Sequence, residues 1–304
     1  MTVVDVTTLK WKINTMNIAI IGTGLMGQAL GERLLAQQQS LTVYNRTQDK
    51  THLLQELGAS VATSAQHAIS ISNISLLLLS DANAINAVLD TIEPSTFHKK
   101  ILIQMGTISP DESRAIAKRL HEVNGLYLEC PVLGSLPEAK SGKLILMAAG
   151  QYDIFSSALP LLNLVGEKPS YFGETGRAST VKLAMNQLIA GLTASFSLSL
   201  SLIEKEQVNV EQFMSVLRES ALYAPTFDKK LDRMLSSDFS KANFPTKHLA
   251  KDIGLFLTVA KDLGIETCAL EGINELLSKT LKQGLADNDY SSIYAGVNSS
   301  VLAK

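Results

Sequence analysis

Short apolar runs recur along the first half of the chain, at 17–21, 41–44, 74–79, 101–104, 126–129 and 144–148. Between them lie segments in which apolar residues return every three or four positions, as in 28–37 and 110–123, and this is the spacing of a helix that buries one face. Strands that alternate with helices pair in parallel, because each helix carries the chain back to the same end of the sheet. The pattern therefore predicts an α/β domain with a mostly parallel sheet and helices on both faces.

The character of the chain changes after Gly176. The strand-like runs stop, and long segments with helical spacing continue through Ile293. We therefore expect an α/β domain over 16–176 and an all-helical domain over 177–304. Residues 1–15 lack the apolar core of a signal peptide, and a second methionine, Met16, directly precedes the first strand. They are interpreted as an N-terminal extension, with either methionine as a possible start.

The segment 183–203 carries no charge, and it is long enough to cross a bilayer. Within it, 195–202 alternates polar and apolar residues, which by itself would predict a strand. An uninterrupted segment of this length is far longer than ordinary strands, so a helix is predicted instead. Asn186, Gln187 and four serines would be costly in hydrocarbon, and this favours a buried helix over a membrane span.

Composition narrows the class of protein. Apolar residues make up 46% of the chain and charged residues 18%, which is typical of a folded protein with a large core. The formal net charge is -2, so no basic field is available to hold nucleic acid or an anionic membrane. Two cysteines cannot form a disulfide framework, and the sequence predicts a cytoplasmic protein.

A glycine-rich segment follows the first predicted strand, and its residues are Gly22, Thr23, Gly24, Leu25, Met26 and Gly27. This G-x-G-x-x-G spacing suits a dinucleotide: one glycine allows the tight turn, the next lets the pyrophosphate approach the backbone, and the last lets the helix pack on the strand. The spacing alone is a weak signal. Its place between a strand and a helix makes a dinucleotide site the better interpretation than an ordinary glycine turn.

The second strand ends in Asn45, Arg46 and Thr47. NAD-binding domains usually carry an acidic residue here, which binds the ribose 2′-hydroxyl. A guanidinium and a hydroxyl instead suit a 2′-phosphate, and none of these three residues is a carboxylate that would repel it. The sequence therefore predicts NADP(H) in preference to NAD(H). Leu79, the last residue of the third apolar run, and Ser80 are further candidate cofactor contacts.

Lys182 and Asn186 are four residues apart on a predicted helix and so share one face. A lysine and an amide that point together could serve the reduction of a carbonyl group, with the lysine giving a proton to oxygen while hydride reaches carbon. A lysine near a helix start is usually only solvated. The uncharged segment that begins directly after Lys182 favours partial burial, and a buried amine gives up its proton more readily.

Other chemistries lack a motif. The five histidines, His52, His67, His98, His121 and His248, show no metal-ligand spacing with each other or with the cysteines, so no metal is expected. There is no G-x-S-x-G sequence, and the pair Gly142-Lys143 is followed by leucine rather than by the serine or threonine of a P-loop.

Several motifs in a fixed order resemble the β-hydroxyacid dehydrogenase family, which includes 3-hydroxyisobutyrate dehydrogenases and glyoxylate/succinic semialdehyde reductases. They are 22–27 with 45–47, Met-Gly-Thr-Ile-Ser-Pro at 105–110, Glu-Cys-Pro-Val-Leu-Gly-Ser at 129–135, 173–186, 244–252 and Asp-Asn-Asp-Tyr at 287–290. The resemblance covers nearly everything from 16 to 297. Together these motifs are far more specific than any one alone.

The resemblance implies a Rossmann domain with a doubly wound parallel sheet, a helical C-terminal domain, and homodimers or homotetramers formed through that second domain. It also implies roles for individual residues. The lysine that matches Lys182 is the catalytic acid and base, the asparagine that matches Asn186 contacts the substrate, and the residues that match Thr107 and Lys251 contact the cofactor. The expected substrate is a small aldehyde or β-hydroxy acid.

The sequence departs from the family in the segment Leu133, Gly134 and Ser135, where the pattern usually reads Ser-Gly-Gly and binds the substrate carboxylate: Gly134 matches the pattern, and Leu133 and Ser135 do not. A leucine cannot donate that hydrogen bond. Either Ser135 and backbone amides replace it, or the substrate carries an apolar group there. Two alternatives therefore stay open: an imine reductase, whose relatives commonly replace the lysine, and a cofactor-binding scaffold without catalysis.

Overall fold

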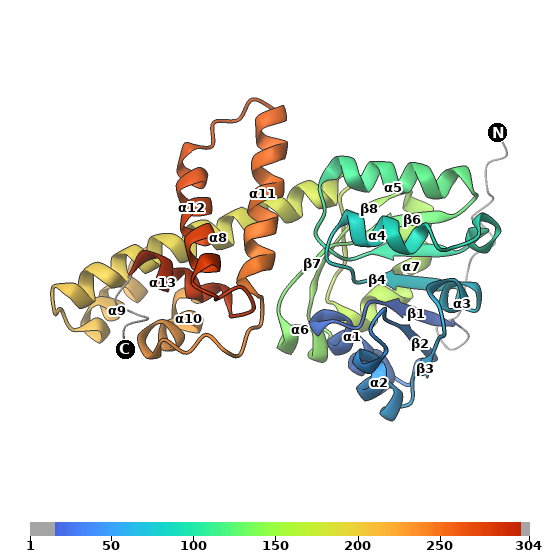
Figure 1. Cartoon of the computed structure of the whole chain (residues 1–304), viewed down its shortest axis with the longest axis horizontal. Coiled ribbons are helices and arrows are strands. Elements are labelled where there is room, and N and C mark those ends of the chain that lie inside the picture. The colour runs from blue at the N-terminus through green and yellow to red at the C-terminus, as the bar shows by residue number, and fades with distance from the viewer. Residues whose placement is uncertain (1–15, 299–304) are drawn as a thin grey trace. The chain divides into compact units, whose positions relative to one another are not determined.

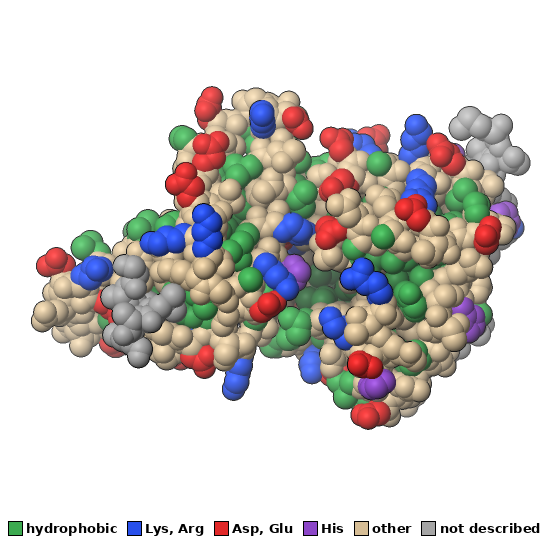
Figure 2. Space-filling model, viewed as in Figure 1, with side chains coloured by type: hydrophobic (Ala, Val, Ile, Leu, Met, Phe, Trp, Pro, Cys, Tyr) green, Lys and Arg blue, Asp and Glu red, His purple; other side chains and the backbone are tan. Residues whose placement is uncertain are grey.

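The computed structural model describes residues 16–298, and the chain divides into two compact units, Met1–Lys182 and Leu183–Lys304. The predicted extension at 1–15 lies outside the described residues. Acidic and basic side chains are interspersed over the face of each unit seen in Figure 2, in keeping with the net charge of -2.

The first unit is built on a sheet of nine strands. Its path runs β3-β2-β1-β4-β5-β6-β8-β7, and β9 pairs with β8. The strands are β1 (Ile18–Ile21), β2 (Leu41–Tyr44), β3 (Ser60–Val61), β4 (Ile74–Leu77), β5 (Ile101–Gln104), β6 (Leu126–Glu129), β7 (Val132–Leu133), β8 (Ile145–Gly150) and β9 (Ser170–Tyr171). Strands β1 to β6 are all parallel, whereas β8 runs antiparallel to both β6 and β7.

Helices cover both faces of this sheet (Figure 1). Successive strand residues point to opposite faces, so Ile18 and Ile20 of β1 enter one core while Ala19 and Ile21 enter the other. The first core also takes residues from α1 (Leu25–Ala36), α2 (His52–Glu56), α6 (Leu136–Ser141) and α7 (Tyr152–Val165), and the second from α3 (Ala65–Ser70), α4 (Ala82–Leu89) and α5 (Pro110–Glu122). The predicted fold class of this half is confirmed.

The described part of the second unit consists of helices. They are the greater part of α8 (Arg177–Lys205), then α9 (Val210–Glu219), α10 (Pro225–Ser236), α11 (Thr246–Asp262), α12 (Cys268–Lys282) and α13 (Ile293–Val297), with a short 3-10 helix at Tyr290–Ser292. Two apolar clusters fill it. One centres on Phe196 and Phe227, whose rings stack at 4.7 Å, and the other lies between α8, α11 and α12.

The alternating stretch 195–202 is helical, as its length predicted. Buried and exposed residues fall in pairs along it: Phe196 and Ser197 are buried, and Leu198 and Ser199 are exposed. Two of its serines fit a helix because their hydroxyls bond to carbonyl oxygens one turn back, Ser197 Oγ to Thr193 O at 2.7 Å and Ser199 Oγ to Ser195 O at 3.2 Å.

Helix α8 is also long and apolar enough to cross a membrane by length and composition. In its most apolar window, 44% is buried inside the protein, and core helices of water-soluble proteins pass the same test. The exposed remainder includes leucines, namely Leu188, Leu192, Leu198 and Leu202.

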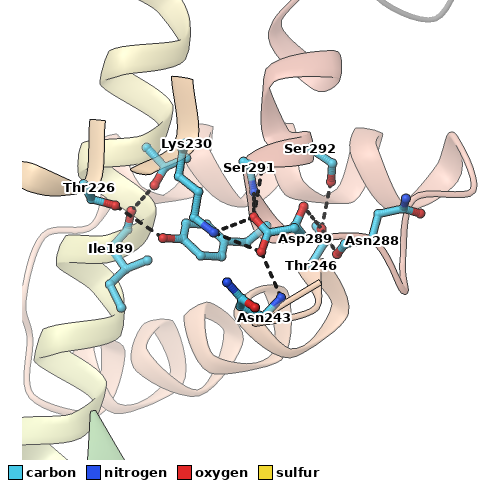
Figure 3. A network of polar contacts seen from close by, with 11 residues as sticks. Ile189, Thr226, Lys230, Asn243, Thr246, Asn288, Asp289, Ser291 and Ser292 are labelled. Carbon is cyan, nitrogen blue, oxygen red and sulfur yellow. Dashed lines mark hydrogen bonds and ion pairs between the residues drawn. The ribbon is translucent and has the colours of Figure 1, made fainter. Parts of the chain in front are cut away.

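A buried ion pair joins α10 to the segment before the 3-10 helix (Figure 3). Lys230 Nζ lies 2.8 Å and 3.0 Å from the two carboxylate oxygens of Asp289, and 4.3 Å from the centre of the Tyr290 ring. The Asp289 side chain is fully buried, and it also accepts hydrogen bonds from the hydroxyl of Ser291 and the backbone N–H of Asn243. Every oxygen of this carboxylate is therefore bonded.

Burial alone would raise the pKa of the Asp289 carboxyl group. The Lys230 ammonium and the hydrogen bonds from Ser291 outweigh that effect and hold the pKa below its usual value. A carboxyl group whose pKa is lower in the folded than in the unfolded chain stabilises the fold above its unfolded pKa, and this stabilisation is lost as the pH falls through the folded pKa.

We expect Asp289→Asn to lower the free energy of unfolding by about 3–5 kcal/mol at pH 7, because it leaves a buried ammonium without its counter-charge. Denaturant unfolding would measure this loss. The loss should be smaller in a Lys230→Met background, and it should shrink as the pH falls below about 4. An equal loss in both backgrounds would contradict the coupling.

Candidate functional site

The predicted cofactor residues of the first unit gather along one edge of the sheet. The strands β2, β1, β4 and β5 are neighbours and parallel, so their carboxyl ends face the same way. The segment 45–47 follows β2, the glycine-rich segment follows β1, Leu79 and Ser80 follow β4, and Thr107 follows β5. The chain continues from β1 to β2 on one side and returns to β4 on the other side, so the strand order reverses at β1. Open α/β sheets bind ligands at such a switch point.

The three glycines of 22–27 occupy positions with different requirements. Gly22 has φ +101°, where a side chain would be strained. A Cβ on Gly27 would lie 1.9 Å from the carbonyl oxygen of Gly22, so only glycine lets α1 approach β1 this closely. A Cβ on Gly24 would meet nothing within 4 Å. There the backbone borders open space into which a pyrophosphate could come close.

Helix α1 begins at Leu25, three residues earlier than expected, with Gly24 as its N-cap. Among the described residues no side chain caps this end, and its first turn holds no acidic residue. The first N–H groups of a helix lack partners within the helix and carry partial positive charge, so they favour an anion. The residues present therefore fit a bound dinucleotide phosphate.

Asn45 braces the loop after β2 against the glycine-rich loop. Its Oδ1 accepts the backbone N–H of Thr23 at 3.1 Å, and its Nδ2 donates to the carbonyl oxygen of Thr47 at 2.8 Å. The amide is thus used within the protein, while Arg46 and Thr47 are exposed beside it. Thr23 is 2% exposed, and its N–H is already taken by Asn45.

Leu79 lies between two glycine loops. Strand β4 ends at Leu77 rather than at Leu79, and a Cβ on Gly22 would come within 3.1 Å of the Leu79 side chain. A Cβ on Gly106 would lie 2.5 Å from the Leu79 carbonyl oxygen. The loops after β1, β4 and β5 therefore touch through backbone. The neighbouring Ser80 hydroxyl donates to Asp81, which caps α4.

Leu133 and Ser135, which depart from the family pattern, both contact other residues of the first unit. Leu133 packs into an apolar cluster with Phe172, Ala178 and Val181, the last two on the first turns of α8. Ser135 caps α6, and both its N–H and its hydroxyl donate to Glu138 Oε2, at 2.8 Å and 2.5 Å. Neither donor of Ser135 points away from this capping box.

Lys182 and Asn186 lie one turn apart on α8, as the sequence predicts, and the boundary between the units follows Lys182. Both side chains are buried: Lys182 is 9% exposed and Asn186 is 1% exposed. Most of the Lys182 residue is thus shielded from bulk water.

The second unit adds Asp252, a carboxylate within the motif 244–252 to which the sequence analysis gave no role. Asn186 Nδ2 donates to Asp252 Oδ2 at 2.5 Å, which turns Asn186 Oδ1 the other way. That oxygen is buried and has no hydrogen-bond partner within 16–298. Lys251 Nζ lies 2.9 Å from Asp252 Oδ1, although not at a hydrogen-bonding angle. An acceptor without a donor here is suited to a ligand hydroxyl.

The surroundings of Asp252 are otherwise mixed in charge. Burial, together with the neighbouring ammonium groups of Lys251 and Lys247, lowers the pKa of His248. The imidazole is therefore neutral at pH 7, and the charged groups around it are Lys247, Lys251, Asp252 and Asp287. Within residues 16–298, no three or more His, Cys, Asp or Glu side chains meet in a way that could hold a metal ion.

Comparison with known proteins agrees with this geometry. A family model described as the NAD binding domain of 6-phosphogluconate dehydrogenase matches residues 17–173, and one described as NAD-binding of NADP-dependent 3-hydroxyisobutyrate dehydrogenase matches 176–297. Glyoxylate/succinic semialdehyde reductase 1 of Arabidopsis thaliana is 30% identical over 93% of this chain and 98% of its own length, and the chloroplastic reductase 2 is 29% identical over 93% and 79%.

Among solved structures, 3-hydroxyisobutyrate dehydrogenase from Salmonella typhimurium has a similar fold. The TM-score is 0.80 at 22% identity, over 92% of this chain and 99% of that one. The match spans both units, so the α/β half and the helical half occur together in that enzyme as well.

We expect Gly24→Ala to weaken NADPH binding by about tenfold or more, equivalent to about 1.4 kcal/mol, while thermal stability stays unchanged. The added methyl group meets no protein atom, but it occupies the space through which the pyrophosphate approaches. Calorimetric titration would measure the Kd. Gly272→Ala on α12, where a Cβ also meets nothing within 4 Å, is the matched control and should leave the Kd as it is. An unchanged Kd for Gly24→Ala would exclude the phosphate from this loop.

Proposed function

The chain belongs to the β-hydroxyacid dehydrogenase family of NAD(P)-dependent oxidoreductases that act on CH–OH groups, and from this premise we propose an NADP(H)-dependent reductase or dehydrogenase of small carbonyl compounds. The substrate would be a small aldehyde or the corresponding hydroxy acid, similar to those named for the plant relatives. Lys182 would be the general acid in reduction and the general base in oxidation.

The observation that carries this proposal is the buried lysine one turn before a buried asparagine. When bound, the nicotinamide supplies or accepts the hydride. Lys182 would donate a proton to the carbonyl oxygen in the same step and take it back in the reverse direction. Asp252 accepts a hydrogen bond from the Nδ2 of Asn186. The Oδ1 of Asn186 therefore remains an acceptor that could orient a substrate hydroxyl or the lysine itself.

Preference for NADP(H) rests on the loop after β2. Asn45 fixes the backbone of this loop through Thr23 and Thr47, and the exposed Arg46 is the next residue after this contact with the glycine-rich loop. A guanidinium forms paired, charge-assisted hydrogen bonds with phosphate. The 2′-phosphate of NADP(H) would gain these bonds, and the 2′-hydroxyl of NAD(H) would not.

The nature of the substrate is narrowed by the segment 133–135. A carboxylate at this place would need donors, but Leu133 has none in its side chain and both donors of Ser135 bond to Glu138. This favours a substrate that is less acidic on this side than the acids bound by the usual serine. The same observation keeps a cyclic imine as the second candidate substrate, although imine reductases commonly lack the lysine.

Screening for NADPH consumption tests the class of substrate. The panel is glyoxylate, succinic semialdehyde, 3-hydroxy acids with NADP⁺, and cyclic imines. Turnover of an aldehyde or hydroxy acid supports the proposal, and turnover of imines alone replaces it with the second candidate. No turnover of any compound would favour a scaffold that binds the cofactor without catalysis.

Replacement of Lys182 by alanine should lower kcat by about 10²- to 10⁴-fold on the substrate found in that screen, the usual contribution of a general acid or base. The Kd for NADPH should stay within about threefold of the wild-type value, since the cofactor loops come from other elements. Lys205→Ala, at the exposed end of the same helix, is the control and should keep full activity. If Lys182→Ala does so too, the lysine has no part in the proton step.

Arg46→Ala should raise the KM for NADPH by about 10- to 100-fold and leave the KM for NADH nearly unchanged, because a charge-assisted bond contributes about 1.5–3 kcal/mol. Steady-state kinetics with both cofactors measure this, and NADH is the internal control. Equal effects on both cofactors would refute the assignment of Arg46 to the 2′-phosphate.

A further inference from the structure

Strand β6 ends in a glutamate that is completely buried. Glu129 is 0% exposed, and β6 is the next strand of the sheet after β5, so this side chain continues the row of loops at the carboxyl edge. A buried carboxylate is costly unless hydrogen bonds replace its water. The partners of Glu129 therefore indicate what this residue does.

One set of partners is the beginning of α8. Glu129 Oε1 accepts the backbone N–H groups of Gly176 at 2.7 Å and Ala178 at 2.9 Å, with Ser179 more distant at 3.4 Å. The Ser179 hydroxyl donates to Oε2 at 2.8 Å. These N–H groups lie at the helix start and lack partners inside the helix, so Glu129 caps α8 from a neighbouring strand.

The other partner fixes the carboxylate from the side of α5. The Ser113 hydroxyl donates to Oε2 at 2.5 Å, and the Tyr127 hydroxyl lies 2.9 Å from Ser113 Oγ. Both oxygens of Glu129 are thus held, one mainly by α8 and the other by α5 and α8 together. The side chain has no freedom to move without breaking several bonds.

Two titratable neighbours of Glu129 in the chain, Tyr127 and Cys130, are buried as well. Burial, with a contribution from the Glu129 carboxylate, raises the pKa of Cys130 to about 12 and also raises the pKa of Tyr127. Both neighbours are therefore neutral at pH 7. The positive end of α8 and its hydrogen-bond donors are what balance this carboxylate.

Lys182 follows Ser179 by three positions, so the two residues lie on the same face of α8, one turn apart. A helix whose first turn is held at three backbone positions can neither rotate nor slide there. The place of the lysine relative to the carboxyl edge of the sheet is then set by the length of the Glu129 side chain.

We propose that Glu129 is a positioning residue, which holds the first turn of α8 so that Lys182 stands where its amine can reach the reacting oxygen. This inference rests on the proposed function, because it assumes the acid and base role of Lys182. It goes beyond that function by assigning a role to a residue whose two carboxylate oxygens both bond to groups of the protein itself.

Two substitutions distinguish the effect of side-chain length at position 129 from the effect of its charge. Glu129→Asp keeps the charge but is one methylene shorter, and a displacement of about 1 Å can cost about 100-fold in rate. We expect kcat to fall by about that factor, with a larger solvent deuterium isotope effect and an NADPH Kd within about threefold of wild type. Glu129→Gln keeps the length and one full acceptor, so kcat should stay within about tenfold of wild type.

Asp289→Asn is the matched control, because it alters a buried, multiply bonded carboxylate whose bonds to Lys230, Asn243 and Ser291 all lie within the second unit. It should lower thermal stability and leave kcat per folded molecule unchanged. Ser179→Ala removes a single side-chain hydrogen bond to Glu129, and it replaces Glu129→Asp as the test if that variant does not fold. Its kcat should fall by at least about threefold, with the Kd for NADPH unchanged.

The outcomes separate this inference from the proposed function. If Lys182→Ala is slow while the Glu129 and Ser179 variants are as fast as wild type, only the positioning role is wrong. A Gln variant as slow as the Asp variant, or a kcat loss matched by lost NADPH binding, also overturns it. Full activity of Lys182→Ala would instead overturn the proposed function, whatever Glu129 does.

Discussion

Parallel pairing of β2, β1, β4, β5 and β6 is the constraint on which the site of the first unit depends. Parallel strands end at the same edge of the sheet. The five segments that follow these strands are far apart in the sequence, and the sheet brings them together at that edge. Each loop then needs only to be short and to carry the right residue. The contact of Gly27 with the Gly22 carbonyl oxygen sets the distance between α1 and the sheet, and this brings the helix N-terminus to that edge.

Buried carboxylates hold helix starts and segment junctions in place through hydrogen bonds. Glu129 holds the first turn of α8, and Asp289 holds α10 and the chain before the 3-10 helix. The cost of burial is offset differently for the two carboxylates. Glu129 accepts hydrogen bonds from backbone N–H groups and hydroxyls, whereas Asp289 also has the Lys230 ammonium as a counter-charge. In both cases one side chain replaces water for several donors, which fixes elements that apolar packing alone would let slide.

Much of the fold could be predicted from periodicity. Runs such as 41–44 and 101–104 are strands with the predicted bounds. The second shows why such runs stand out, since a central parallel strand is buried on both faces. The short strands β3, β7 and β9 were not predicted, because two residues leave no period to detect. Strand β4 ends before the apolar run does, since Leu79 is used to pack against glycine loops rather than to extend the sheet.

The sequence by itself determined the residue types of the site, because glycine, arginine and lysine at fixed spacing satisfy local requirements of turns, charge and helix faces. It could not decide what those residues bond to. Ser135 and Glu138 form a local capping box, three residues apart, but the bonds of Asn45 to Thr23 and of Asn186 to Asp252 join residues 22 and 66 positions apart. Only tertiary structure chooses among such partners, because hydrogen bonds between distant residues depend on how the elements pack and leave no periodic trace in the chain.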